Sequence, residues 1–272
     1  MKKLVHCWLL LVFLLPVMAS AAVLDVPGDY TTISEAVNAA FDGDTIRLAD
    51  GTYSSPDDYN VDFNSRSLTV ESASGDPNSC IIDCQQNGRA FLALNYENIT
   101  LKGLTIKNGE AGSSSGGGLY FDTATLVASN CIFEGNHAQN GGAVYIVNPS
   151  SSCTFSNCSF STNTSERDGG AVYAASTAFG DCSFDGNSGG NYGGAVYSVN
   201  KSSFANCAVS AGTAPLMVAR FITSILNLPI LQFPAGRHLL TAYFPATVLP
   251  LMPVQYLIVI LIKHRMPPFL PP

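Results

Sequence analysis

Between residues 104 and 209 the hydrophobic and polar positions recur with a period of about 25 residues. Three segments align by eye, CIFEGNHAQNGGAVY from Cys131, CSFSTNTSERDGGAVY from Cys158 and CSFDGNSGGNYGGAVY from Cys182, and a weaker copy begins at Leu104. Pieces such as Cys-Ser-Phe and Ala-Val-Tyr alternate as strands do, and the Asn, Gly, Ser and Asp between them are turn formers. Such a period, varying by a few residues, indicates coils of short strands joined by uneven turns.

The pattern predicts an all-β fold, a right-handed single-stranded parallel β-helix that stacks like residues over like. Helical repeats of this length would need long amphipathic runs, and leucine-rich repeats would need regularly spaced leucines; the sequence has neither. A short helix is expected before the first coil, because Thr32 and Glu35 can form a capping box and Ile33, Ala36 and Val37 fall on one helical face. Such a helix would cover the open N-terminal end of the solenoid.

Two repeated features, a pair of glycines and an asparagine, have a structural explanation. The Gly-Gly pairs at 117–118, 141–142, 169–170 and 193–194 suit corners that need positive φ or close backbone approach. Asn136, Asn163 and Asn187 each follow a phenylalanine by three residues. Stacked at a bend, their amides are expected to hydrogen-bond from coil to coil as a ladder.

The FxxN tetrads FEGN, FSTN and FDGN, each followed by GGAVY, resemble the repeats of the polymorphic outer-membrane proteins of bacteria. The N-terminal stretch also resembles the opening of many pectin-lyase-like β-helix proteins, and the resemblance covers roughly residues 23–209. It implies an exported passenger region with an adhesin-like role at the cell surface or outer membrane. Members of the outer-membrane family are much longer and usually end in a β-barrel, and the residues after Val209 do not show its alternating strands.

The composition divides the chain into three parts. Residues 1–21 read as a signal peptide, with Lys2 and Lys3 before an apolar run and a cleavage site at Ala19-Ser20-Ala21. Residues 22–209 are the β-helix domain. Residues 210–272 form a hydrophobic, Pro-rich tail, irregular or helical, that we interpret as a frameshifted end, a membrane anchor through residues 239–262, or an end cap.

The charge follows the same division. Residues 22–209 carry 20 acidic and 7 basic residues, and no acidic residue follows Asp185. An acidic body argues against nucleic acid as a partner, because phosphates need a basic surface. Export to an oxidising, extracellular or cell-surface location follows from the signal peptide, and contact with the membrane is expected only through the tail.

Seven cysteines remain after the signal peptide. Cys131, Cys158, Cys182 and Cys207 hold one repeat position and are expected to form an inward column, where thiols pack as small hydrophobic groups. Neighbouring coils are close enough for some disulfides, and the pair Cys80 and Cys84, or Cys153 with a neighbour, are further candidates. No metal site is expected, since His137 is alone near the column.

An active site is not evident. The weak catalytic candidates are Asp168, Asp181, Asp185 and Arg167; Asp185 shares a repeat position with Glu134, but Ser161 occupies the coil between them. A lyase or hydrolase acting on acidic polysaccharide needs clustered carboxylates, often with an arginine, and Ca²⁺ is expected only if the chain is such a lyase. Otherwise we expect no cofactor. The cluster Asp57, Asp58 and Asp62 reads as a solvated loop.

The better binding candidate is a tyrosine column, formed by Tyr120, Tyr145, Tyr173 and Tyr197. The sequence does not decide whether these rings face inward or outward. On the outside they would offer an aromatic surface to glycans or surface proteins; otherwise they stack along the wall of the fold. The favoured function is therefore a non-enzymatic, adhesin-like scaffold, and the alternative is a polysaccharide-active enzyme.

Overall fold

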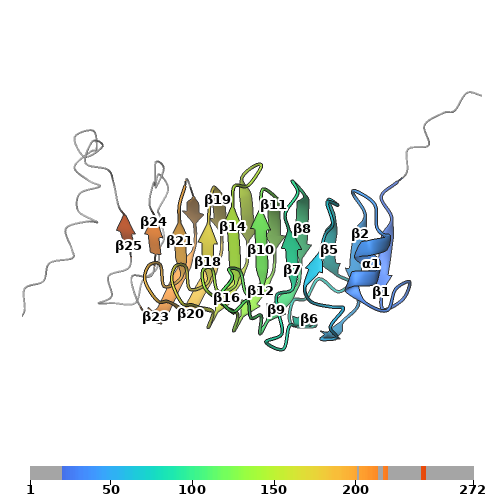
Figure 1. The fold of residues 1–272 in the computed structure, drawn as a ribbon, viewed down its shortest axis with the longest axis horizontal. Coiled ribbons are helices and arrows are strands. Elements are labelled where there is room, and N and C mark those ends of the chain that lie inside the picture. The colour runs from blue at the N-terminus through green and yellow to red at the C-terminus, as the bar shows by residue number, and fades with distance from the viewer. Residues whose placement is uncertain (1–19, 201, 214–216, 220–239, 243–272) are drawn as a thin grey trace, which may run out of the picture.

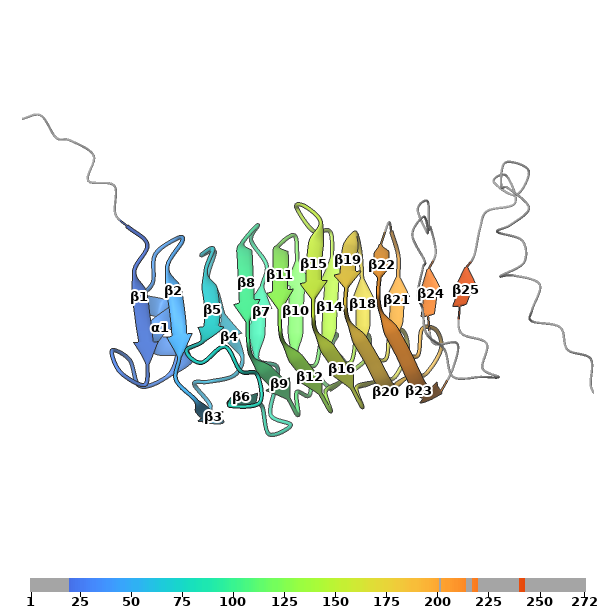
Figure 2. The ribbon, with the colours of Figure 1, turned by 180° about the vertical axis from the view of Figure 1, so that it is seen from behind.

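The computed structural model describes residues 20–200, 202–213, 217–219 and 240–242, and in them the chain winds through three parallel sheets that we call A, B and C. From residue 45 onward, each coil contributes a strand to sheet A, then to sheet B, then to sheet C, and the coils stack along one long axis (Figure 1; Figure 2 shows the molecule from behind). The solenoid makes about seven turns. The predicted parallel β-helix is confirmed.

The three sheets alternate regularly along the chain. Sheet A contains β1 (Val23–Val26), β2 (Thr45–Leu48), β5 (Thr69–Ser72), β8 (Asn98–Lys102), β11 (Thr125–Ser129), β15 (Cys153–Ser156), β19 (Thr177–Gly180) and β22 (Ser203–Ala205). Sheet B contains β3 (Gly51–Tyr53), β6 (Cys80–Asp83), β9 (Thr105–Lys107), β12 (Ile132–Glu134), β13 (His137–Ala138), β16 (Ser159–Ser161), β17 (Thr164–Ser165), β20 (Ser183–Gly189) and β23 (Ala208–Thr213). Sheet C contains β4 (Val61–Asp62), β7 (Phe91–Ala93), β10 (Leu119–Asp122), β14 (Val144–Val147), β18 (Val172–Ala174), β21 (Val196–Ser198), β24 (Met217–Ala219) and β25 (Leu240–Ala242).

Buried phenylalanines form two stacks inside the solenoid. In sheet B, Phe133, Phe160 and Phe184 pair in register, and the ring centroids of neighbours lie 4.9 and 4.8 Å apart. In sheet A, Phe155 and Phe179 stack at 5.3 Å. Rings of the two sheets also meet edge to face, as Phe133 and Phe155 do at 6.0 Å. This packing buries apolar area and adds the favourable geometry of offset aromatic pairs.

The predicted asparagine ladder lies at the bend after each sheet B strand, and its three side chains are fully buried. The amide nitrogen of Asn163 donates to the Phe133 carbonyl at 2.9 Å and to the Asn187 side-chain oxygen at 3.0 Å. Its oxygen accepts from both the main chain and the side chain of Asn136, each at 3.0 Å. The asparagine side chains therefore provide hydrogen-bond partners for main-chain groups at the bend that have no partner within the sheet.

The glycine corners differ by one residue from the sequence alignment in one coil. Gly117 and Gly118 donate to the carbonyls of Gly142 and Ala143, so the pair equivalent to Gly141-Gly142 is 116–117 and not 117–118. The first glycine of each corner has positive φ, at 70° for Gly116 and 58° for Gly141. A Cβ at Gly142 would collide with the main-chain carbonyl oxygens of Gly170 and Thr164. The first position of the corner thus needs glycine for its positive φ, and the second needs it for the close approach of neighbouring main chain.

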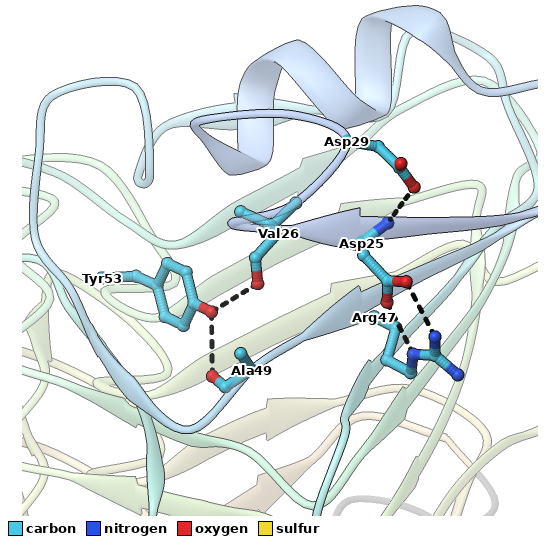
Figure 3. Close-up of polar contacts among 6 residues, drawn as sticks. All are labelled: Asp25, Val26, Asp29, Arg47, Ala49 and Tyr53. Atoms are coloured by element: carbon cyan, nitrogen blue, oxygen red, sulfur yellow. Dashed lines mark hydrogen bonds and ion pairs between the residues drawn. The ribbon is translucent and has the colours of Figure 1, made fainter.

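The N-terminal end carries the predicted cap, the helix α1 (Ile33–Ala39), with Thr32 and Glu35 in a reciprocal capping box. Asp58 is buried rather than solvated, and its carboxylate accepts from the Ile33 amide at 3.1 Å. Close by, the Tyr53 hydroxyl donates to the carbonyls of Val26 and Ala49 at 2.7 and 2.8 Å (Figure 3). These bonds attach the helix and the first strands to the coils below them.

The end of the solenoid lies past the predicted boundary at Val209, because β23 continues to Thr213 and pairs with β20. Beyond it, β24 pairs with β21 and β25 pairs with β24. The expected signal peptide, apart from its last two residues, and the rest of the expected tail lie outside the described residues. In the part of the chain that the structure describes, no helix is long and apolar enough to cross a membrane.

We predict that Asn163→Ala lowers the free energy of unfolding by about 2–4 kcal/mol, because it leaves buried amide and carbonyl groups without partners. Urea denaturation followed by circular dichroism measures the change. Ser161→Ala, at a half-buried outward position two residues earlier, is the matched control and should change stability by less than about 0.5 kcal/mol. Equal effects of the two substitutions would contradict a stabilising ladder.

Candidate functional site

The outer face of sheet C carries the tyrosine column. Tyr120, Tyr145, Tyr173 and Tyr197 are register partners on β10, β14, β18 and β21. Figure 1 shows these strands side by side at the front of the molecule. Val144, which precedes Tyr145, is fully buried, while Tyr145 itself is half-buried. The structure therefore decides the open question of the sequence: the tyrosines lie on the outside of the wall.

The corner explains why counting alternate residues did not give this answer. Ala143 and Val144 are consecutive and both fully buried, because the chain bends where it leaves the Gly-Gly corner. Regular alternation starts only at Val144 and continues through Tyr145 and the buried Ile146. If inward and outward side chains alternated from the inward Ala143, Tyr145 would point inward. Because they alternate from the inward Val144, Tyr145 points outward.

The rings are stacked on one another along the solenoid axis. Successive centroids lie 5.3, 4.8 and 5.1 Å apart, with interplanar angles between 24 and 38°. The faces of the inner rings are therefore covered by neighbouring rings, and the outer surface consists of ring edges. Burial raises the pKa of Tyr120 and Tyr145, and the carboxylate of Asp122 raises both further. Both hydroxyls thus stay protonated at neutral pH and can donate hydrogen bonds.

Arg89 covers the N-terminal end of the column, with its guanidinium 5.3 Å from the centre of the Tyr120 ring. Its nitrogens donate to the carbonyls of Gly116 and Ser115 and to the Ser114 hydroxyl, each at 3.2 Å. Burial lowers the pKa of Arg89, and the described residues give it no carboxylate partner. The sequence analysis missed this residue, since it belongs to no repeated position.

Tyr192 packs against the other end of the column. Its ring lies 6.3 Å from that of Tyr197 at an interplanar angle of 29°, and 48% of the side chain is exposed. Tyr197 is 8% exposed, so it is the most buried of the four. Sequence reasoning missed Tyr192 as well, although its place directly before the Gly-Gly pair of the third GGAVY copy was a usable signal.

A polar column runs along the corner beside the tyrosines. It contains Ser115, Asn140, Asp168 and Tyr192, which precede successive glycine corners and are linked by main-chain hydrogen bonds from Gly116, Gly141 and Gly169. The Asn140 amide donates to the Ser115 hydroxyl at 3.2 Å. One oxygen of Asp168 is buried with no hydrogen-bond partner. Burial raises the pKa of the Asp168 carboxyl, while the Tyr192 amide and the charge of Arg167 act in the opposite direction.

The other weak catalytic candidates are not gathered around Asp168. Arg167 is adjacent but exposed. Asp181 has a φ of 53° at the bend between sheets A and B and accepts from the Asn206 amide at 3.1 Å. Asp185 lies on sheet B and accepts from the Ser210 hydroxyl at 2.6 Å. The candidate acids therefore occupy separate corners and faces of the solenoid.

The expected acidic strip on sheet B is interrupted, as the sequence indicated. Glu134, Ser161 and Asp185 are register partners, so a serine separates the two carboxylates. One coil earlier, Lys107 takes the position of Glu134 and forms an ion pair with Asp83 at 3.5 Å. Among the described residues, no group of three or more His, Cys, Asp or Glu side chains is placed to hold a metal ion.

Residues 50–209 match the model of the family described as the right handed beta helix region. The chain belongs to this family, which agrees with the three-sheet solenoid and gives its handedness. No curated protein sequence matches the chain significantly.

Several solved structures are distantly similar to this chain. Pectin methylesterase from Aspergillus niger, in its deglycosylated form, is 15% identical over 83% of this chain and 84% of its own, with a TM-score of 0.48. Escherichia coli YbhC is 13% identical over 77% and 70% of the two chains, with a TM-score of 0.47. The PL6 family alginate lyase AlyGC is 13% identical over 83% of this chain and 39% of its own, with a TM-score of 0.43. Similarity this low carries no argument about activity.

We predict that Asp168→Asn makes the protein more stable at neutral pH. A raised pKa means that the folded state favours the neutral carboxyl, so wild-type stability falls as the pH rises through that pKa. The advantage of the variant should vanish below about pH 4, where the carboxyl is protonated in the unfolded chain as well. Urea midpoints measured from pH 3 to pH 8 give both curves.

Asp76→Asn is the control of opposite sign. Hydrogen bonds from Asn78 and Ser79 lower the pKa of the Asp76 carboxyl. This variant should be less stable than the wild type at neutral pH, and the difference should disappear in acid. If both substitutions gave the same pH dependence, burial at Asp168 would not be the cause.

Proposed function

We propose that the protein is an exported, cell-surface β-helix protein, akin to the polymorphic outer-membrane repeats, that binds extended polysaccharide along sheet C and is not an enzyme. The observation that carries the proposal is the outward tyrosine column with Arg89 at one end and Tyr192 at the other. The signal-like N-terminus and the FxxN and GGA motifs support export to a surface. The match to the β-helix family supports the scaffold.

The spacing of the column suits a polymer that lies parallel to the axis. Neighbouring tyrosine rings have centroids 4.8 to 5.3 Å apart because they lie on adjacent strands, so they form a regular row that an extended chain of similar repeat can follow. The coils of Tyr120, Tyr145 and Tyr173 would then each meet one sugar with the edge of one ring and its polar neighbours. Because the inner ring faces are covered, hydrogen bonding along the edges is the main contact, and face stacking is left to the exposed Tyr192 at the end.

Charge favours a neutral polymer over a uronate. Residues 22–209 have 13 more acidic than basic residues, and Asp122 and Asp168 lie beside the column. A polyanion would be repelled from such a surface, whereas a neutral polysaccharide would not. Arg89 can still donate to sugar hydroxyl groups without a charge on the ligand.

A lyase or hydrolase is the second candidate, and Asp168 is the observation that favours it. A half-buried carboxyl with a raised pKa resembles a general acid. Glycoside hydrolysis usually needs a second carboxylate across the bond, and the other candidate acids lie elsewhere on the solenoid. Neither Asp181 nor Asp185 is therefore placed to act as the second carboxylate with Asp168.

We predict that Tyr145→Phe weakens binding of soluble β-1,4-xylan about 3- to 10-fold, because it keeps the stacked ring and removes a hydrogen-bonding edge. Tyr145→Ala should weaken binding by about tenfold or more. Isothermal titration calorimetry measures both affinities. Tyr96→Ala is the matched control, since Tyr96 is 70% exposed and lies outside the column, and it should bind as the wild type does.

The same preparation distinguishes the two functions. Incubation with xylan and with polygalacturonate, with and without Ca²⁺, should release neither reducing ends nor unsaturated uronates. Release that is lost in Asp168→Asn would support the enzyme instead. Equal xylan binding by the wild type and both Tyr145 variants, or no binding at all, would overturn the proposed binding face.

A further inference from the structure

Four buried thiols form a column in successive coils, one residue before the sheet B strands. Cys131, Cys158, Cys182 and Cys207 are each 1 or 2% exposed. The carbonyls of Cys131, Cys158 and Cys182 accept main-chain hydrogen bonds from Ser159, Ser183 and Ala208 in the next coil, each at 2.9 Å. This main-chain pattern stacks every cysteine directly over the next, in the same register as the sheet B strands that follow them.

The side chains of neighbouring members are in direct contact. The thiols of Cys158, Cys182 and Cys207 donate to the carbonyls of Ala128, Phe155 and Phe179 in the preceding coil. Each thiol also interacts with that of the neighbouring coil strongly enough to shift its pKa. Neighbouring strands in a sheet lie about 4.8 Å apart, which falls within the range of Cα separations that a disulfide spans. Closing the bond also requires the Cβ atoms of the two cysteines to lie about 3.8 Å apart, so the two coils must approach slightly at this position.

The other three cysteines have no thiol neighbour of this kind. Cys80 lies in the same column, but the residues that flank it in register are Gly51 and Leu104. Cys153 pairs with Thr177, and its sulfur accepts from the Leu126 amide at 3.3 Å. Cys84 is buried beyond the end of β6 and donates its main-chain amide to Lys107.

We propose that the column is a disulfide site in which Cys131 joins Cys158 and Cys182 joins Cys207. Only neighbours can pair, so this arrangement alone uses all four thiols; joining Cys158 to Cys182 would leave the two outer cysteines more than one coil apart. The seven cysteines among the described residues are free thiols in the structure. The inference concerns the scaffold and does not depend on the proposed polysaccharide binding.

The chemistry is thiol–disulfide exchange with an oxidising small-molecule or protein disulfide. A column thiolate attacks one sulfur of that oxidant and releases the other as a thiol. The neighbouring column thiolate then attacks the mixed disulfide, which forms the new S–S bond and releases the second oxidant thiol. The column loses two electrons and two protons, and the oxidant is reduced to two thiols.

The thiols of neighbouring coils affect each other's pKa. The interaction with Cys158 and main-chain hydrogen bonds lower the pKa of Cys131, and the same interaction raises the pKa of Cys158. Because the thiols are buried, reaction takes place during folding or after local opening of a coil.

Each link would close one coil of the solenoid. The loops contain 27 and 25 residues, from the separations of the paired cysteines. Cross-links of this size restrict the unfolded chain and stabilise the folded one. They would join the four coils that carry the column two by two, in the half of the solenoid opposite the helical cap.

The test is oxidative refolding of the full chain in a buffer of oxidised and reduced glutathione. Alkylation under denaturing, non-reducing conditions and peptide mass spectrometry then identify the pairs. We expect the links 131–158 and 182–207, with Cys80, Cys84 and Cys153 alkylated. Reduction should lower Tm by on the order of 10 °C.

Two variants sharpen the result. Cys158→Ala should keep the link between Cys182 and Cys207 and leave Cys131 open to alkylation, while Cys153→Ala, the control, should keep both links. Complete alkylation of the wild type after oxidation, or a single link from Cys158 to Cys182, would overturn the proposal. The disulfide pairs found in the wild type test the proposal even if Cys158→Ala does not fold.

Discussion

The register between neighbouring coils depends most directly on the buried asparagine amides. Asn163 satisfies both coils that flank it, since it donates to Phe133 and Asn187 and accepts from Asn136. A slip by one residue would leave several buried polar groups unpaired, which costs more free energy than the loss of one apolar contact. The phenylalanine, cysteine and tyrosine columns follow from this single constraint. Differences in coil length are absorbed elsewhere, mainly between Tyr145 and Cys158.

The glycine corner determines which side chains lie next to one another on the outer face of sheet C. Because a side chain at Gly142 would meet the carbonyls of two neighbouring segments, the chain can turn there only with glycine. The turn brings the residue before the pair close to the tyrosine after it, as Tyr192 and Tyr197 show. The polar corner column and the tyrosine column therefore become one surface.

The sequence was sufficient for the parts of the fold that repeat. The solenoid, the Thr32 capping box, the asparagine ladder and the inward cysteines could be predicted because each has a local signal or recurs in register. The face of the tyrosines could not, because it depends on where alternation restarts after a bend. Arg89 and Tyr192 were missed because their roles arise from contacts between coils at positions that do not repeat. In the weakest copy, three consecutive glycines concealed the true corner at Gly116.

The distribution of charge separates sheet C from the other two sheets. On sheet A, Arg47 is bound to Asp25 and Lys102 to Glu71, and on sheet B, Lys107 is bound to Asp83. Such exposed pairs satisfy each other and leave little to attract a ligand. Arg89 instead lies on an aromatic ring and donates to neutral carbonyl and hydroxyl groups. Among the described residues no carboxylate neutralises this cation, which lies at the end of a row of tyrosine edges, and this is why the proposed binding face is on sheet C.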